Sequence, residues 1–75
     1  MSKLNVFDDD KKIATITIIG NFKFLFARTS REWSDMKRLL DAAERLHEAD
    51  PSADVLESLI TMLHNFNYST ELSDK

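Results

Sequence analysis

Two histidines and three consecutive aspartates are the side chains in this sequence that most suggest a catalytic or metal site. Histidine titrates near neutral pH, but the His-x-x-x-His spacing of helical zinc sites does not occur around His47 or His64. The run from Asp8 to Asp10 lacks the spaced ligands of an EF-hand and has Ile19 where that loop needs a glutamate. We therefore predict packed or rim histidines, a solvated acidic turn and no metal site.

Residue sets for other catalytic chemistry are missing as well. The chain has no cysteine, which excludes disulfides, thiolate zinc sites and a cysteine nucleophile. Its single glycine argues against a phosphate-binding loop, and no Gly-x-Ser-x-Gly elbow occurs. We expect a protein that is not an enzyme and that uses no cofactor and no small-molecule substrate.

A predicted β-hairpin from Ile13 to Arg28 is the element around which the rest of the chain is organised. Two runs rich in β-branched and aromatic residues flank Gly20-Asn21, which is typical of a two-residue hairpin loop. With this loop Ile19 lies opposite Phe22, and the remaining pairs follow from the alternation of side chains along a strand. Both faces of the hairpin are then largely apolar, whereas a sheet with one side in water alternates apolar and polar residues.

One of these faces must pack on the helices, and the other needs a different cover. We predict that the aromatic face is internal, because three rings are the largest apolar surface in the chain. That face carries Phe22, Phe24 and Phe26. The aliphatic face, with Ile16, Ile18 and Leu25, would then be open in a monomer and mark a contact surface. The alternative is that the third strand, the tail or the sheet twist covers it within one chain.

A further strand and two helices complete the predicted fold. Lys3 to Phe7 is a β-prone run that would pair antiparallel with the first half of the hairpin. Thr29 is placed to cap a first amphipathic helix. Asp50-Pro51 is expected to end that helix and begin a second one, which runs to about Asn65.

The predicted fold class is therefore α+β, with a three-stranded antiparallel meander followed by two antiparallel helices packed on one sheet face. We expect a single small domain, with the meander over residues 1–28 and the helical hairpin over 29–66. Residues 67–75 are polar and are predicted to fray. The N-terminus lacks a signal-peptide core and no stretch approaches a membrane span, which favours a cytoplasmic protein with no membrane partner.

A small protein-binding module, such as an inhibitor, adaptor or assembly factor, is the function that the sequence favours. Self-association as a homodimer is expected too, because a chain this short without disulfides or metal has few other sources of stability. The net charge is −3, and the acidic residues are concentrated after Leu39, which gives the helices an acidic surface. The residues predicted to contact a partner are Ile16, Ile18, Lys23, Leu25, Arg28 and Arg31.

The alternative is a small nucleic-acid-binding regulator. Basic residues surround Trp33, and aromatic rings among cations can stack bases. These basic residues are Lys23, Arg28, Arg31 and Lys37. Strand, helix and helix follow one another as in a ribbon-helix-helix dimer, although this is a similarity of order alone. Against the alternative, the predicted second helix has no lysine or arginine to face a phosphate.

Overall fold

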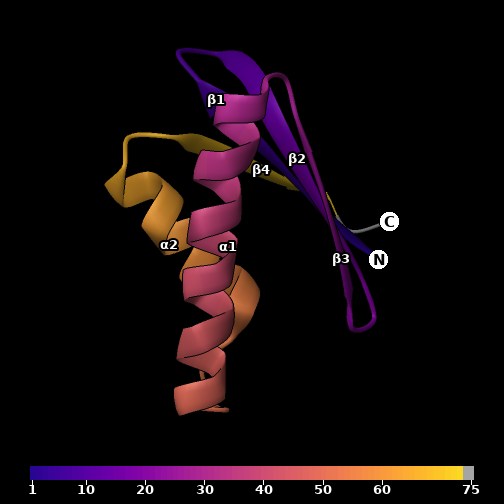
Figure 1. The fold of residues 1–75 in the computed structure, drawn as a ribbon, viewed down its shortest axis with the longest axis vertical. Coiled ribbons are helices and arrows are strands. Elements are labelled where there is room, and N and C mark those ends of the chain that lie inside the picture. The colour runs from indigo at the N-terminus through magenta and orange to yellow at the C-terminus, as the bar shows by residue number, and fades with distance from the viewer. Residues whose placement is uncertain (74–75) are drawn as a thin grey trace.

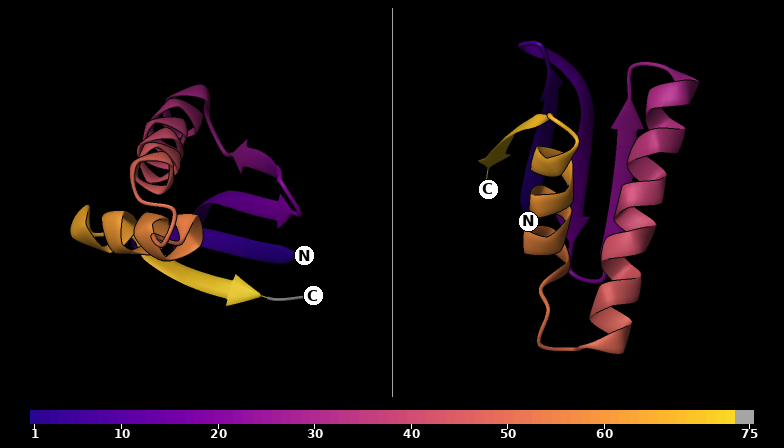
Figure 2. Two further views of the ribbon diagram at one scale, coloured as in Figure 1. Left: turned by 90° about the horizontal axis from the view of Figure 1, so that it is seen from below. Right: turned by 90° about the vertical axis from the view of Figure 1, so that its left-hand side faces the viewer.

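The computed structural model describes residues 1–73 as a two-layer α+β fold. The elements are β1 (Ser2–Asp8), β2 (Lys11–Ile19), β3 (Phe22–Ala27), α1 (Ser30–Ala49), α2 (Val55–Asn65) and β4 (Ser69–Ser73). The strands form one antiparallel sheet in the order β3-β2-β1-β4. Both helices lie on the same side of this sheet and run antiparallel to each other (Figure 1, Figure 2). The predicted α+β class is confirmed.

The central hairpin forms in the predicted register. Ile19 pairs with Phe22, and the pairing continues without a shift to Ala14 and Ala27. Gly20 has a φ of 59° and is followed by a residue with negative φ, the combination found in a type II′ turn. Glycine is required at this first turn position because a side chain disfavours positive φ there.

The turn between β1 and β2 is formed by Asp9 and Asp10. Both residues have positive φ, at 50° and 66°, which is the pattern of a type I′ turn. Aspartate tolerates this left-handed conformation better than most residues. The aspartate run therefore shapes a tight hairpin loop.

A β-bulge in β2 then shifts the pairing with β1 by one residue. Val6 pairs with Ala14 rather than with Ile13, so Ile13 is the extra residue of the bulge. Further along, Leu4 pairs with Ile16. Because a shift of one residue moves a strand's side chains to the other face, the bulge aligns the apolar residues of β1 with the aliphatic face of the hairpin.

The core lies between that aliphatic face and the helices, with α1 packed against β2 and β3 and α2 against β4. Fully buried apolar side chains from both layers meet there. They are Leu4, Val6, Ile13, Ala14 and Ile16 from the strands, and Met36, Leu40, Ala43, Leu59 and Leu63 from the helices. Within residues 1–73 neither helix is long and apolar enough to cross a bilayer.

The prediction that the aromatic face of the hairpin lies inside is wrong. Phe22, Phe24 and Phe26 are 70%, 51% and 75% exposed, whereas Ile16 is 0% exposed. The physical reason is the bulge. It extends the aliphatic face across β1 as one continuous apolar surface, while β1 contributes polar residues to the aromatic face.

The C-terminal segment is a strand and not a frayed tail, so the predicted three-stranded sheet is one strand short. β4 pairs with β1, with Leu72 opposite Leu4 and Thr70 opposite Val6. Asn67, with a φ of 68°, reverses the chain after α2. The last two residues of the predicted tail, at positions 74 and 75, lie outside the described residues.

One of the two predicted helix starts is confirmed. The Thr29 hydroxyl accepts a hydrogen bond from the backbone N–H three residues on, at 3.1 Å, and caps α1. The prediction that Asp50 caps α2 is wrong, because its carboxylate instead accepts from the Ser52 amide and hydroxyl in a local turn. α2 begins later, where the Asp54 carboxylate accepts from the Glu57 amide at 3.2 Å.

The burial of the two hairpin faces predicts a large loss of stability on truncating one face and a small loss on truncating the other. Ile16→Ala should lower the free energy of unfolding by about 2–5 kcal/mol, because it leaves a cavity in a fully packed site. Phe24→Ala on the opposite face should lower it by less than about 1 kcal/mol. Urea denaturation followed by circular dichroism measures both. A larger loss for Phe24→Ala than for Ile16→Ala would contradict this assignment of the faces.

Candidate functional site

The face of the sheet that the helices leave open divides into a mostly apolar half and a mostly polar half. On β2 and β3 its large residues are Ile19, Phe22, Phe24 and Phe26, which we call the aromatic face. Ile19 is 45% exposed. On β1 and β4 the pairs of this open face are Lys3 with Ser73, Asn5 with Glu71, and Phe7 with Ser69. Most of the exposed apolar side chain of the open face therefore lies on the half of the sheet built by the central hairpin, with the half-buried Phe7 as the aromatic residue of β1.

The aromatic face is large for a chain of 75 residues. With roughly 200 Å² for a whole aromatic side chain, the exposed fractions of the three phenylalanines correspond to about 400 Å². The largest apolar patch of a typical soluble monomer measures about 300–600 Å² and is often functional. One strand of this small molecule thus carries a patch in that range.

Smaller side chains lie beside the rings. Thr17 pairs with Phe24 and Thr15 pairs with Phe26, so a strip of threonines on β2 runs along the row of rings on β3. The Thr15 hydroxyl donates to Asn5 Oδ1 at 3.0 Å, which ties its polar atom to the polar half of the sheet. The aromatic face therefore consists of a raised row of rings next to a lower threonine strip.

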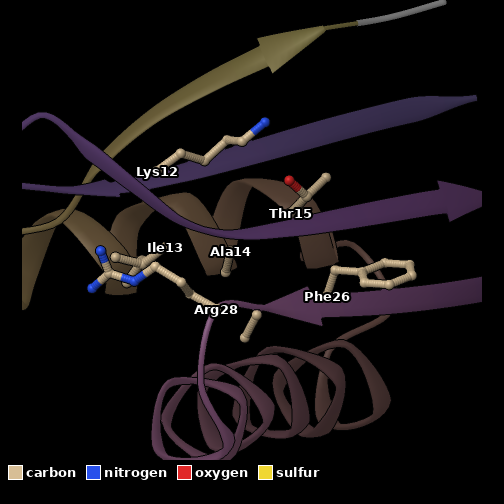
Figure 3. A pocket seen from close by; sticks show the side chains of 7 residues that line it. Lys12, Ile13, Ala14, Thr15, Phe26 and Arg28 are labelled. Carbon is tan, nitrogen blue, oxygen red and sulfur yellow. The ribbon is translucent and has the colours of Figure 1, made fainter.

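A shallow hollow of about 210 Å³ lies at the end of this strip, where the chain leaves β3. Figure 3 shows Phe26 and Thr15 on one side of it and Arg28 on the other. The residues that line it are Lys12, Ile13, Ala14, Thr15, Phe26, Ala27 and Arg28. The hollow thus extends the aromatic face toward the cationic side chains of Lys12 and Arg28.

The outer edge of β3 is covered by α1. The Arg28 amide donates to the Ile13 carbonyl across the hairpin at 2.9 Å. Because backbone groups of successive residues point to opposite sides of a strand, the Leu25 carbonyl, three residues before Arg28, points to the free edge. There it accepts a hydrogen bond from Trp33 Nε1 at 3.3 Å. The indole therefore occupies an edge acceptor that another strand would need for pairing.

The structure does not bring the six predicted contact residues together on one exposed surface. Ile16 is fully buried, and Ile18 and Leu25 are partly buried against the core. Lys23 projects toward α1, where its Nζ lies 3.7 Å from Glu44 Oε2. The three aliphatic residues therefore stabilise the fold.

The two predicted arginines lie exposed at the start of α1. Arg28 forms a bidentate salt bridge with Glu32. Its Nε donates to Oε1 at 3.2 Å and its Nη2 donates to Oε2 at 2.8 Å. These hydrogen bonds hold the pKa of the Glu32 carboxyl below its ordinary value and raise the pKa of Arg28. Within residues 1–73 Arg31 has no ion-pair partner.

Most of the basic cluster considered for nucleic acid is neutralised by neighbouring carboxylates. Lys37 Nζ lies 2.9 Å from Asp41 Oδ1, and this hydrogen bond raises the pKa of Lys37. Lys23 and Arg28 have the carboxylate partners described above. Of the four cations, Arg31 is left to attract a phosphate, which weakens the electrostatic case for nucleic acid.

The histidines tie neighbouring segments together. His47 Nδ1 donates to the Ala53 carbonyl at 2.8 Å, since a carbonyl can only accept. His64 Nε2 lies 3.0 Å from Thr70 Oγ1, between α2 and β4. Glu44 precedes His47 by the Glu-x-x-His spacing, but its carboxylate faces Lys23. No group of three His, Asp or Glu side chains in residues 1–73 is placed to hold a metal ion.

The sequence contained only part of the signal that places the phenylalanines outside. In the run Lys3-Leu4-Asn5-Val6 the apolar residues alternate with polar ones, so β1 has a clear inner and outer face. Its apolar side had to be matched to one face of the hairpin, and the bulge decides which. Counting rings on the hairpin alone gave the wrong face.

Comparison with known proteins yields no relative from which to transfer a function. No protein-family model, curated protein or solved structure matches this chain. The open aromatic face and its surroundings are therefore the observations that bear on function.

The Arg28–Glu32 contact predicts a measurable effect of pH. Arg28→Ala should raise the pKa of Glu32 toward its ordinary value near 4.5, and the control Arg31→Ala should leave it unchanged. Because the pKa is lowered in the folded chain, the contribution of Glu32 to stability is present above pH 4.5 and lost as the pH falls through the lowered value. NMR titration of the Glu32 carboxyl measures the shift. Equal pKa values in both variants would contradict this assignment.

Proposed function

We propose that this chain is a small, non-enzymatic protein-binding module of the inhibitor, adaptor or regulatory kind, and that the aromatic face is its contact surface. The observation that carries the proposal is the exposure of Phe22, Phe24 and Phe26 on one strand. Covering about 400 Å² of apolar surface at about 25 cal/mol per Å² yields roughly 10 kcal/mol before the costs of association are subtracted. That is enough to support specific binding.

The rings are also held in place before a partner arrives. β3 pairs along its whole length with β2. Its other side is fastened to α1 by the Lys23–Glu44 ion pair and by the hydrogen bond from Trp33 to the Leu25 carbonyl. A surface that is already ordered loses less entropy on binding, so more of the apolar gain remains as affinity.

The helices add an acidic surface at the opposite layer of the molecule. Exposed carboxylates flank the loop between α1 and α2, namely Glu48, Asp50, Asp54 and Glu57. Such a field speeds the approach of a basic partner and repels acidic ones. In this proposal the aromatic face supplies affinity and the acidic helical surface influences which partners approach.

Nucleic-acid binding is the second candidate, favoured by the aromatic face itself. Rings displayed on an open sheet are a surface on which unpaired bases stack. Lys12 and Arg28 line the hollow beside Phe26 and could approach a phosphate. The net charge of −3 and the paired cations speak against it, because phosphate neutralisation supplies most of such affinity.

Site-specific photo-crosslinking tests the protein-binding proposal. Benzoylphenylalanine placed at Phe24 should yield discrete protein adducts in cells that produce the chain. The same probe at Phe66, which is 64% exposed but lies at the end of α2, should not. Adding Phe26→Asp should abolish the adducts at position 24. Identical adducts at both positions, or none at position 24, would contradict the proposal.

A titration distinguishes the second candidate. We expect no saturable binding of a mixed-sequence single-stranded oligonucleotide at low salt, up to about 100 µM, the weak end of non-specific nucleic-acid affinity. Fluorescence of Trp33 and anisotropy of a labelled oligonucleotide both report binding. Saturable binding that weakens with salt and is lost in Phe24→Ala would favour nucleic acid over protein as the partner.

A further inference from the structure

We infer that the partner of the aromatic face is a second copy of this chain, packed face to face about a two-fold axis parallel to the strands. The inference rests on the proposed function and adds the identity of the partner and the geometry of the contact. It is carried by the shape of the open face, by its division into apolar and polar halves, and by the covered edge of β3.

The shape of the aromatic face is self-complementary. The row of rings on β3 stands beside the lower threonine strip on β2. A two-fold axis between these strands lays the row of each copy over the strip of the other. Rotation about such an axis does not move a residue along the strand direction. Since Phe24 pairs with Thr17 within one chain, Phe24 of one copy comes over Thr17 of the other. Two sheets packed about 10 Å apart form this kind of isologous contact.

The hollow at the end of the strip lies where this arrangement places a ring. Phe26 pairs with Thr15, so Phe26 of one copy comes over Thr15 and the hollow of the other. The hollow of about 210 Å³ is shallow and open to solvent, so it offers a seat for part of a ring. Lys12 lines the hollow without an ion-pair partner in residues 1–73, and its ammonium can approach the face of the incoming ring.

The polar half of the sheet stays in water in this arrangement. An axis between β2 and β3 places β3 of each copy over β2 of the other. It leaves β1 and β4 uncovered. Those strands carry most of the polar residues of the open face, including Lys3 and Glu71, together with the half-buried Phe7. The overlap thus covers the strongly exposed rings of β3 and leaves a mostly polar surface in water.

Edge-to-edge pairing, the other common way to join two sheets, is opposed at β3. A strand added there would have to displace the Trp33 indole from the Leu25 carbonyl. The face is free of such an obstacle. Pairing through the faces is therefore favoured over pairing at the β3 edge.

The size of the contact predicts a weak, concentration-dependent dimer. With Ile19 included, each copy would cover about 500 Å² of apolar side chain, so the pair buries roughly 1,000 Å². This lies at the low end for specific interfaces. We expect a dissociation constant in the range of about 1–100 µM.

Light scattering and sedimentation across concentration test the inference. From about 1 to 500 µM, a range set by the expected affinity, the mean mass should rise from 8.7 kDa toward twice that value. Phe24→Asp should remain at 8.7 kDa, and the matched variant Phe66→Asp should behave as the parent chain. Circular dichroism verifies that each variant is folded. A constant mass, or equal effects of both variants, would overturn the inference.

The crosslinked products separate this inference from the function on which it rests. An adduct from position 24 with twice the chain mass, mapped to residues 11–19 of the second copy, supports the face-to-face pair. Adducts from position 24 with a different protein, together with a constant mass in solution, overturn the second copy and leave the protein-binding proposal standing. The absence of any adduct from position 24 overturns both.

Discussion

One extra residue in β2 determines which side of the sheet becomes the core. Without the bulge at Ile13, the two-residue turn would pair Leu4 with Thr15 and bring the apolar side of β1 to the aromatic face. With it, Leu4 and Val6 join Ile16 in one aliphatic surface that the helices cover. The rings of β3 are left outside as a consequence, so the core and the open aromatic face have the same structural origin.

Local features of the chain could be predicted from the sequence, because neighbouring residues determine them. The Gly20-Asn21 loop and the Thr29 cap are of this kind, and both form as predicted. The choice of face depends on a one-residue insertion that no local pattern announces. β4 is polar and short, and it forms because it completes the edge of β1. The predicted contact residues Ile16, Ile18 and Leu25 therefore lie on the core side of the hairpin, whereas the face that stays open carries the phenylalanines.

The contacts that stabilise β3 also determine which of its groups remain available for binding. Its side chains alternate between the core and the open face, so Leu25 packs inside while Phe24 and Phe26 stay outside. Its edge is occupied by Trp33 from α1. The strand thus exposes its rings, while its backbone pairs with β2 on one side and the Leu25 carbonyl is occupied by Trp33 on the other. A surface of this kind favours side-chain packing over strand addition.

The return of β4 to β1 places Lys3 opposite Ser73, so both ends of the described chain meet at one end of the sheet. A circular permutation that joined these ends through a short linker and opened the chain at Pro51 would keep every strand pairing. The strands would then follow one another in their sheet order, as a simple four-stranded meander flanked by the helices. Lower contact order speeds folding, so the permuted chain would reach the same architecture faster than the natural one.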